Sequence, residues 1–236
     1  MYNKDHPTFI IKESLHKPIW RYMDFWKFLN LLETSSLYFS NAENLGDNYE
    51  GRIPKIVYEL MIAEDKENGN TNNQDTNDYL ESHLRKETLI SSWTYDEKES
   101  FAMWKMYAKD KMGIAIKTDF VSLISCFNKT ERDIYIGEVS YFDEENFRYP
   151  TNNLYYPFLV KLNYYSSEKE LRCITSCRHD EEHESKLVEV DLNELVKNIY
   201  ISPNSKPEFK KMLSLLKTEY KLNFEINFSE VNDSWL

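Results

Sequence analysis

Thr88-Leu89-Ile90-Ser91-Ser92-Trp93 is an apolar run that ends in two hydroxyls and an indole, and it predicts a buried β-strand. Helical patterns flank this run, over residues 78–86 before it and 99–109 after it. Beyond the second helix, short strand patterns follow one another with few helices between them. Consecutive strands of this kind favour an α+β fold over a doubly wound parallel sheet.

The remainder of the chain divides into short elements with the same character. Extended or strand patterns cover residues 9–22, 36–40, 113–117, 134–142, 159–164, 170–175, 186–191, 195–202 and 224–228. Further helical patterns cover residues 25–32, with Asp24 as N-cap, and residues 54–63, 119–127 and 206–220. The polar stretch 64–77 predicts a mobile loop inside a single domain, 1–236, rather than a linker between two domains.

The formal net charge of −11 excludes some classes of partner. Neutralising phosphates requires a basic surface, so nucleic acid is not expected as a general coat, although it stays open as a substrate. Three cysteines do not form a disulfide framework, and we expect neither a signal peptide nor a membrane span. The sequence therefore predicts a cytoplasmic protein without a membrane partner.

Two familiar kinds of site lack support from the motifs. With only five glycines and no glycine-rich loop, a backbone cradle for phosphate is not expected. Cys173, Cys177, His179 and His183 have a spacing that can hold zinc. Because Cys173 falls inside an expected strand and the other three in a charged loop, we favour an inward-facing cysteine followed by a solvated turn, and we expect no metal.

Arg21 is flanked by Trp20 and Tyr22 at the end of an early strand. Its guanidinium presents a planar fork of donors that suits phosphate or carboxylate. The alternative is an ion pair with a carboxylate of the chain itself, such as Asp47 or Glu50. The sequence leaves these two interpretations equally open.

Ser91, Ser92 and Trp93 place polar groups at the end of the apolar strand. The hydroxyls can hydrogen-bond a sugar or orient a carboxylate, and the indole can pack against a flat ring. The alternative is a strand end whose hydroxyls satisfy nearby backbone groups.

Glu168 and Glu170 share one face if their segment is extended, because side chains two residues apart point the same way in a strand. Such carboxylates can hold a ribose hydroxyl and stabilise positive charge that develops on an anomeric carbon. The alternative is a solvated charge run, which is common in an acidic protein.

The order of these pieces resembles the bacterial family named domain of unknown function 2971, which has no assigned activity. The resemblance spans about residues 19–201. The segments that carry it are Trp20-Arg21-Tyr22, Leu37-Tyr38-Phe39-Ser40, Leu45-Gly46-Asp47-Asn48-Tyr49-Glu50-Gly51, Ile90-Ser91-Ser92-Trp93, Ser100-Phe101-Ala102-Met103-Trp104-Lys105-Met106-Tyr107, Gly113-Ile114-Ala115-Ile116 and Tyr165-Ser166-Ser167-Glu168-Lys169-Glu170-Leu171-Arg172.

The same order, an early-strand arginine, a serine-containing strand and a later Glu-x-Glu, also looks like the Arg-Ser-Glu pattern of ADP-ribosyltransferases. This weaker resemblance implies a split, mostly antiparallel α+β sheet flanked by helices, with NAD as the substrate in a central cleft. It implies that Arg21 holds a phosphate or ribose of NAD and that Ser91 or Ser92 steadies the site. The Ser91-Ser92-Trp93 segment departs from the usual Ser-Thr-Ser.

The resemblance also implies roles for the acidic and aromatic residues. Glu170 would hold the nicotinamide ribose 2′-hydroxyl and favour the oxocarbenium-like state, and Glu168 would orient or deprotonate the acceptor. Stacking on the nicotinamide or adenine is implied for the aromatic residues Tyr22, Trp93, Trp104 and Tyr107.

Three functional hypotheses follow. The first is an NAD-consuming transferase or glycohydrolase, with an unidentified macromolecular acceptor in the transferase case, as in many bacterial toxins and antiphage effectors. The second is a non-catalytic module that senses a nucleotide or another anion in the same cleft. The third, disfavoured by the acidic charge, is a nuclease whose carboxylates Asp47, Glu50, Glu168 and Glu170 bind Mg²⁺.

Overall fold

The computed structural model describes residues 2, 6, 8–45, 50–53, 55–67, 74–108, 112–143, 154–178, 181–182, 184–203 and 205–231. Within these residues the strands are β1 (Pro18–Met23), β2 (Ser36–Asn41), β3 (Thr88–Tyr95), β4 (Ile114–Asp119), β5 (Tyr135–Glu138), β6 (Ser140–Phe142), β7 (Val160–Leu162), β8 (Glu170–Ser176), β9 (Lys186–Glu189), β10 (Asn198–Ile201) and β11 (Glu225–Phe228). The α-helices are α1 (Phe25–Thr34), α2 (Lys55–Glu67), α3 (Gln74–Glu87), α4 (Phe101–Tyr107), α5 (Phe120–Cys126), α6 (Leu192–Leu195) and α7 (Pro207–Glu219).

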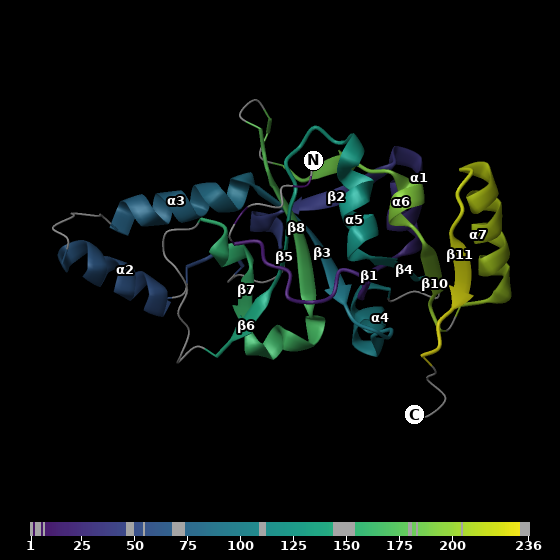
Figure 1. The fold of residues 1–236 in the computed structure, drawn as a ribbon, viewed down its shortest axis with the longest axis horizontal. Helices are drawn as coiled ribbons and strands as arrows, with labels where there is room; N and C mark the ends of the chain where they lie inside the picture. Colours follow the sequence, from purple (N-terminus) through teal and green to yellow (C-terminus); the bar gives the residue numbers. More distant parts are fainter. Residues whose placement is uncertain are drawn as a thin grey trace.

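The described strands form a nine-stranded sheet and a separate two-stranded pair (Figure 1). The longest path through the large sheet runs β11-β10-β4-β1-β3-β2-β9, and β8 joins β3 to β5. Only β10 and β11 run parallel in this sheet, and all its other pairs are antiparallel. The expected α+β class with a mixed, mostly antiparallel sheet is therefore confirmed.

The sheet is split along one edge of β3. The other edge of β3 pairs with β8 from Thr88 to Thr94. On the split edge, β1 pairs with Thr94 and Tyr95 only, and β2 pairs with Leu89 and Ile90 only. Strands β1 and β2 therefore diverge from each other beside the middle of β3, at the Ser-Ser-Trp segment that the sequence singles out.

Alternation along β1 assigns its side chains to two different cores. Ile19 and Met23 join the main core, which also holds apolar side chains of α1, α5, α6 and α7. Trp20 and Tyr22 point to the opposite face, where they pack against α4. This alternation matches the expected opposite orientation of neighbouring residues in the strand.

Helix α1 begins where the sequence predicts. The carboxylate of Asp24 accepts a hydrogen bond of 2.8 Å from the backbone N–H of Lys27, which satisfies a donor in the first turn. The helix ends at Thr34, and the C-cap residue Ser35, with a positive φ of 47°, stops the helical hydrogen bonding and turns the chain into β2. Helix α1 thereby buries Phe28 and Leu32 in the main core and sets the position of β2 beside the split.

Three expectations about local structure need correction. Helices α2 and α3 extend into the stretch 64–77, expected as a loop, and residues 68–73 lie outside the described part. The expected strand 134–142 breaks into β5 and β6, which belong to different sheets. Of the expected strand 195–202, Leu195 is instead the last residue of α6, a one-turn helix capped by the Asp191 carboxylate, and the strand itself, β10, begins at Asn198.

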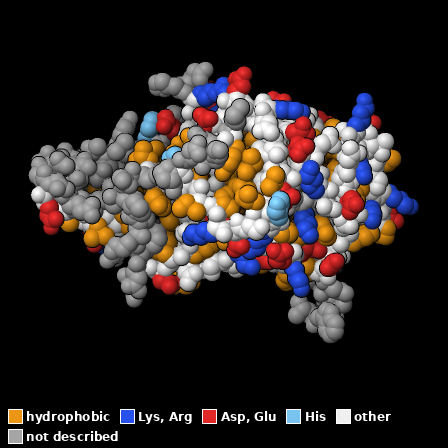
Figure 2. Space-filling model, viewed as in Figure 1, with side chains coloured by type: hydrophobic (Ala, Val, Ile, Leu, Met, Phe, Trp, Pro, Cys, Tyr) orange, Lys and Arg blue, Asp and Glu red, His pale blue; other side chains and the backbone are white. Residues whose placement is uncertain are grey.

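The surface carries both signs of charge. Figure 2 shows acidic and basic side chains interspersed on one face of the molecule, without a continuous basic area. Among the described residues, none of the helices combines the length and apolar character that crossing a membrane requires.

Candidate functional site: a cavity at the split in the sheet

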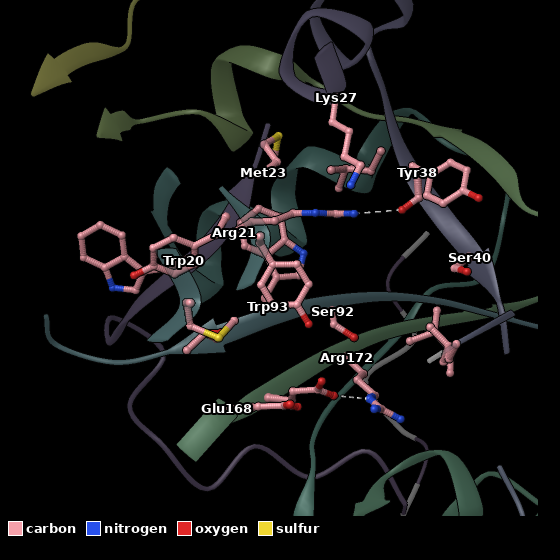
Figure 3. A pocket seen from close by; sticks show the side chains of 18 of the residues that line it. Trp20, Arg21, Met23, Lys27, Tyr38, Ser40, Ser92, Trp93, Glu168 and Arg172 are labelled. Carbon is pink, nitrogen blue, oxygen red and sulfur yellow. Dashed lines mark hydrogen bonds and ion pairs between the residues drawn. The ribbon is translucent and has the colours of Figure 1, made fainter. Parts of the chain in front are cut away.

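A cavity of about 780 Å³ lies at the split between β1 and β2 (Figure 3). Its volume falls within the range typical of small-molecule sites. The sequence-predicted site residues that line it are Arg21, Tyr22, Ser92, Trp93, Tyr107, Glu168 and Glu170. Residues from β1, β3, α4 and β8, far apart in the sequence, thus share one cavity.

Arg21 reaches across the split. Its Nη1 donates to the hydroxyl of Ser91 on β3, and its Nη2 donates to the backbone carbonyl of Tyr38 on β2 at 3.0 Å. The guanidinium carbon lies 5.6 Å from the ring centroid of Trp93, in a cation–π arrangement. These contacts fix the orientation of the guanidinium, and its other N–H donors have no acceptor among the described residues.

No carboxylate among the described residues forms an ion pair with Arg21. Burial lowers the pKa of Arg21 to about 10, so its guanidinium is still charged at neutral pH. The alternative that Arg21 pairs with Glu50 is wrong, because Glu50 pairs elsewhere, and Asp47 lies outside the described residues. A partly buried cation without a counter-ion at a cavity wall suits an anionic ligand.

A cluster of charged residues forms another part of the cavity wall. Lys161 on β7 holds three carboxylates: its Nζ lies 2.8 Å from Glu168, 3.1 Å from Glu50 and 3.4 Å from Glu170. Arg172 on β8 donates from Nε to Glu170 at 2.5 Å and from Nη2 to Glu50. With three carboxylates and two cations, the cluster carries one negative charge in excess when all are ionised.

The two predicted catalytic carboxylates converge without the expected extended geometry. Glu168 ends a 3₁₀ helix, Lys169 adopts a left-handed conformation with φ 44°, and Glu170 begins β8. This turn at Lys169 aims both carboxylates at Lys161 and directs the Lys169 ammonium outward, where it pairs with Asp96 at 2.6 Å. The expectation that they lie on one strand face is wrong, but their proximity is real.

Glu50 reaches the cluster through a turn that requires glycine. Gly51 has a φ of 73°, and a Cβ on it would lie 2.4 Å from the ring of Phe158. Its backbone N–H donates to the carbonyl of Pro157 at 3.2 Å, which ties this segment to the chain preceding β7. The backbone carbonyl of Phe158 in turn accepts from Nη1 of Arg172 at 2.9 Å.

The environments of Glu168 and Glu170 move their pKa values apart. Burial alone would raise the pKa of Glu170, but the charges of Arg172 and Lys161, together with hydrogen bonds from Arg172 and Glu168, outweigh burial and lower it to about 2. Burial is the main influence on Glu168 and raises its pKa; together with the charge of Glu170 it outweighs the hydrogen bond and charge of Lys161, which lower it. Such separation suits a permanent anion beside a proton acceptor.

Two predicted site residues do not line the cavity. The Ser91 side chain is buried, and its hydroxyl accepts from Arg21, so it positions that guanidinium. Trp104 is buried behind Tyr22, with the two rings 5.0 Å apart, and its indole N–H donates to Glu99 at 2.9 Å. Trp104 therefore supports the wall from behind and is not placed to stack on a ligand.

The remaining predicted aromatic residues have different surroundings. The hydroxyl of Tyr22 accepts a hydrogen bond of 2.8 Å from the backbone N–H of Ser100, which anchors α4 to β1. The indole nitrogen of Trp93 is buried and has no hydrogen-bond partner in the described part of the chain. Tyr107 is 45% exposed and lines the wall, so it offers the most accessible of these rings.

Sequence reasoning missed several residues of the cavity. They are Tyr38, Lys161, Tyr165 and Arg172. One signal was available for Arg172, which lies two residues after Glu170 and therefore shares its face of the strand. Lys161 gave no signal, because it is a single charge in a three-residue strand.

The structure describes some of the residues that the zinc and Mg²⁺ alternatives require. Cys173 is buried in the main core and burial raises the pKa of its thiol to about 12, while His179 and His183 lie outside the described residues. Of the carboxylates that the Mg²⁺ alternative needs, Glu50, Glu168 and Glu170 surround the ammonium of Lys161. That ammonium takes the position between them that the alternative assigns to a metal ion.

The fold is similar to that of a solved structure. The chain is similar to DarT of Thermus sp. 2.9, solved in complex with NAD⁺, with a TM-score of 0.44 and 7% sequence identity over 92% of this chain and 97% of that chain. No family model and no curated protein matches the sequence, so its likeness to domain of unknown function 2971 stays a resemblance.

Proposed function

We propose that the cavity binds NAD and that the protein cleaves it as an enzyme of ADP-ribosyltransferase type. The observation that carries the proposal is that Arg21 and the Glu168–Glu170 pair line one cavity. The guanidinium offers an anion site with no counter-ion in the described part of the chain, and the charge cluster offers a site with excess negative charge. NAD has the matching distribution, because its diphosphate is anionic and its nicotinamide ring is cationic.

Arg21 binds the anionic part of the ligand in this proposal. Its contacts to Ser91 and to the Tyr38 carbonyl hold the guanidinium in place before a ligand arrives. Such preorganisation reduces the ordering cost of binding. The flat rings of Trp93 and Tyr107 along the same cavity suit the aromatic ends of a dinucleotide.

Glu170 stabilises the charge that develops when the glycosidic bond breaks. The bond between the ribose anomeric carbon and the nicotinamide nitrogen opens, nicotinamide departs with the electron pair, and positive charge spreads over the anomeric carbon and ring oxygen. A carboxylate with a pKa of about 2 stays ionised throughout this step. It can also accept a hydrogen bond from the ribose 2′-hydroxyl, since each carboxylate oxygen has two lone pairs.

Glu168 receives the proton of the attacking group. An acceptor hydroxyl, amine or water adds to the anomeric carbon and gives up its proton to the carboxylate, whose raised pKa makes it a better base than Glu170. Water as the acceptor gives ADP-ribose, and a macromolecular acceptor gives an ADP-ribosylated product.

The direct test is release of nicotinamide from NAD, measured by chromatography with and without cell lysate as the source of an acceptor. Wild-type protein should release nicotinamide and Glu170→Gln should not. Glu131→Gln, which changes a 90% exposed carboxylate, serves as the matched control and should behave as wild type. Absence of both NAD binding and nicotinamide release would contradict the proposal.

A second candidate function is a non-catalytic sensor of a nucleotide or another anion. The observation that favours it is that Glu170 already has two cationic partners, Arg172 and Lys161, as a purely structural anion would. This function predicts NAD or nucleotide binding that Arg21→Ala abolishes, with no nicotinamide release. Calorimetric titration beside the chromatographic assay separates the two functions.

An NAD-consuming enzyme of this kind would act as a toxin in the bacterial cytoplasm. Induced expression of the wild-type chain should then deplete cellular NAD or modify a host macromolecule and arrest growth. Expression of Glu170→Gln at the same level should leave growth unchanged. Challenge of such cells with phage tests the antiphage role, and equal plaque numbers with wild type and Glu170→Gln would contradict that role.

A further inference from the structure

The ammonium of Lys161 has as many hydrogen-bond donors as there are carboxylates around it. A lysine ammonium has three N–H donors, and its Nζ lies within 3.4 Å of Glu50, Glu168 and Glu170. The Lys161 side chain is only 6% exposed, so water competes little for these donors. One side chain therefore connects three acidic residues that are otherwise mutually repulsive.

The surroundings of Lys161 keep its ammonium in one place. The ring of Tyr165 lies under Nζ at 4.7 Å from the centroid, which adds a cation–π contact. Strand β7 pairs with β6 in a register that sets Lys161 opposite Tyr141, and the Tyr141 hydroxyl accepts from the backbone N–H of Glu170 at 2.8 Å. The two-stranded pair is thereby attached to the start of β8, where the catalytic carboxylates lie.

We propose that Lys161 is a positioning residue: its ammonium holds Glu168 and Glu170 together in the cavity wall, and its charge sets the pH at which Glu168 takes up a proton. Its consequence for catalysis rests on the proposed function, whereas its effect on proton uptake does not. Lys161 itself is not assigned a contact with substrate.

The groups around Glu168 show why Lys161 decides its protonation. The charged groups that act on Glu168 are Lys161 and Glu170, and Tyr107 and Tyr141 also interact with it. Glu50, Arg172 and Tyr165 surround Lys161. Burial and the charge of Glu170 raise the pKa of Glu168, and the hydrogen bond and charge of Lys161 are the influences that lower it. Without the ammonium, burial and the charge and hydrogen bond of Glu170 still raise the pKa of Glu168, so it takes up a proton at higher pH.

The test compares free energies of unfolding in denaturant between pH 8 and pH 5 for wild type, Lys161→Met and Lys169→Met. Lys169 is the matched control because it is adjacent to both glutamates in the chain but pairs with Asp96, outside the cluster. In folded Lys161→Met, Glu168 keeps its proton at pH values where the same carboxyl group in the unfolded chain, with its ordinary pKa of 4.5, has lost it. Its stability relative to wild type therefore rises as the pH falls, by up to about tenfold in the folding equilibrium constant per pH unit.

The Lys169→Met curve should stay parallel to wild type over the same pH range. A parallel curve for Lys161→Met would overturn the proposal. If Lys161→Met is unfolded at pH 8, it should fold on acidification to pH 5 or when Glu168→Gln is added. Failure of both rescues would equally overturn the proposal.

Catalysis provides the second readout. The acidic limb of kcat/KM for nicotinamide release should lie at higher pH in Lys161→Met than in wild type, and it should be unmoved in Lys169→Met. The stability measurements contain no NAD, so they remain decisive if the proposed function fails. Turnover by wild type together with parallel stability curves would instead overturn the Lys161 proposal alone.

Discussion

Arg21 on β1 donates a hydrogen bond of 3.0 Å to the backbone carbonyl of Tyr38 on β2, across the split in the sheet. Where a continuous sheet would have backbone pairing, a guanidinium side chain connects the two strands. The split thus provides both the space for the cavity and a cation at its wall.

Replacing Arg21 should weaken ligand binding more than it changes the fold. A hydrogen bond to a charged group contributes about 1.5–3 kcal/mol, so Arg21→Ala should weaken NAD binding by roughly 10- to 100-fold in calorimetric titration. Arg21→Lys should restore it only in part, because lysine lacks the planar fork. Arg178→Ala, at an exposed arginine, is the control. Unchanged affinity in Arg21→Ala would refute the assignment.

Arg172 should be among the most costly residues to replace. It is 1% exposed, and among the described residues its removal leaves Lys161 as the one cation paired with Glu50 and Glu170. Breaking a buried ion pair costs about 3–5 kcal/mol, so Arg172→Met should lower the free energy of unfolding by that amount in urea denaturation. A loss no larger than that of the exposed control Arg178→Met would show that the cluster contributes little.

The lowered pKa of Glu170 predicts a specific pH dependence of the free energy of unfolding. Its pKa falls from 4.5 to about 2 on folding, so its ionised form contributes stability that is present above about pH 4.5 and is lost as the pH falls toward 2. Because Glu170 also raises the pKa of Glu168, the comparison is made in a Glu168→Gln background. There, the difference in unfolding free energy between the chains with and without Glu170→Gln should be constant from pH 8 to pH 5 and should shrink at lower pH. A difference that stays constant down to pH 3 would contradict the ion pairing.

The aromatic residues should separate into structural and ligand-binding groups. Trp104→Phe removes the indole hydrogen bond to Glu99, so it should lower stability by about 1 kcal/mol while leaving NAD affinity unchanged. Tyr107→Leu should weaken NAD binding with little change in stability, because this ring is half-exposed at the cavity wall. Denaturation and calorimetry on both variants test this, and the reverse assignment of effects would contradict it.

Local patterns predicted most of the fold. Helix α1 has helical periodicity and a capping residue, β3 is an apolar run and β8 has strand-forming residues, so all three lie close to their expected positions. Strand β1 forms the end of the extended stretch expected over residues 9–22. The stretch 64–77 misled because its polar composition resembles a loop, yet α2 and α3 both extend into it. Tertiary packing can override composition in this way, and single-sequence patterns do not contain that information.

The sequence predicted the cavity better than the contacts inside it. Order along the chain was enough to group Arg21, Trp93 and Glu170, which line one cavity. The partners of Glu170 depended on tertiary structure, because Lys161 and Glu50 come from distant segments with no pattern linking them. Trp104 was misplaced for the opposite reason, since an amphipathic helix does not reveal which neighbouring surface its aromatic face meets.

The most direct test of the central claim is a crystal structure of the protein with a carbocyclic analogue of NAD, whose glycosidic bond cannot be cleaved. We predict that the diphosphate contacts the Arg21 guanidinium and that the nicotinamide ribose contacts Glu170, with the ligand in the cavity at the split. A ligand bound elsewhere, or one in the cavity that contacts neither residue, would contradict the account.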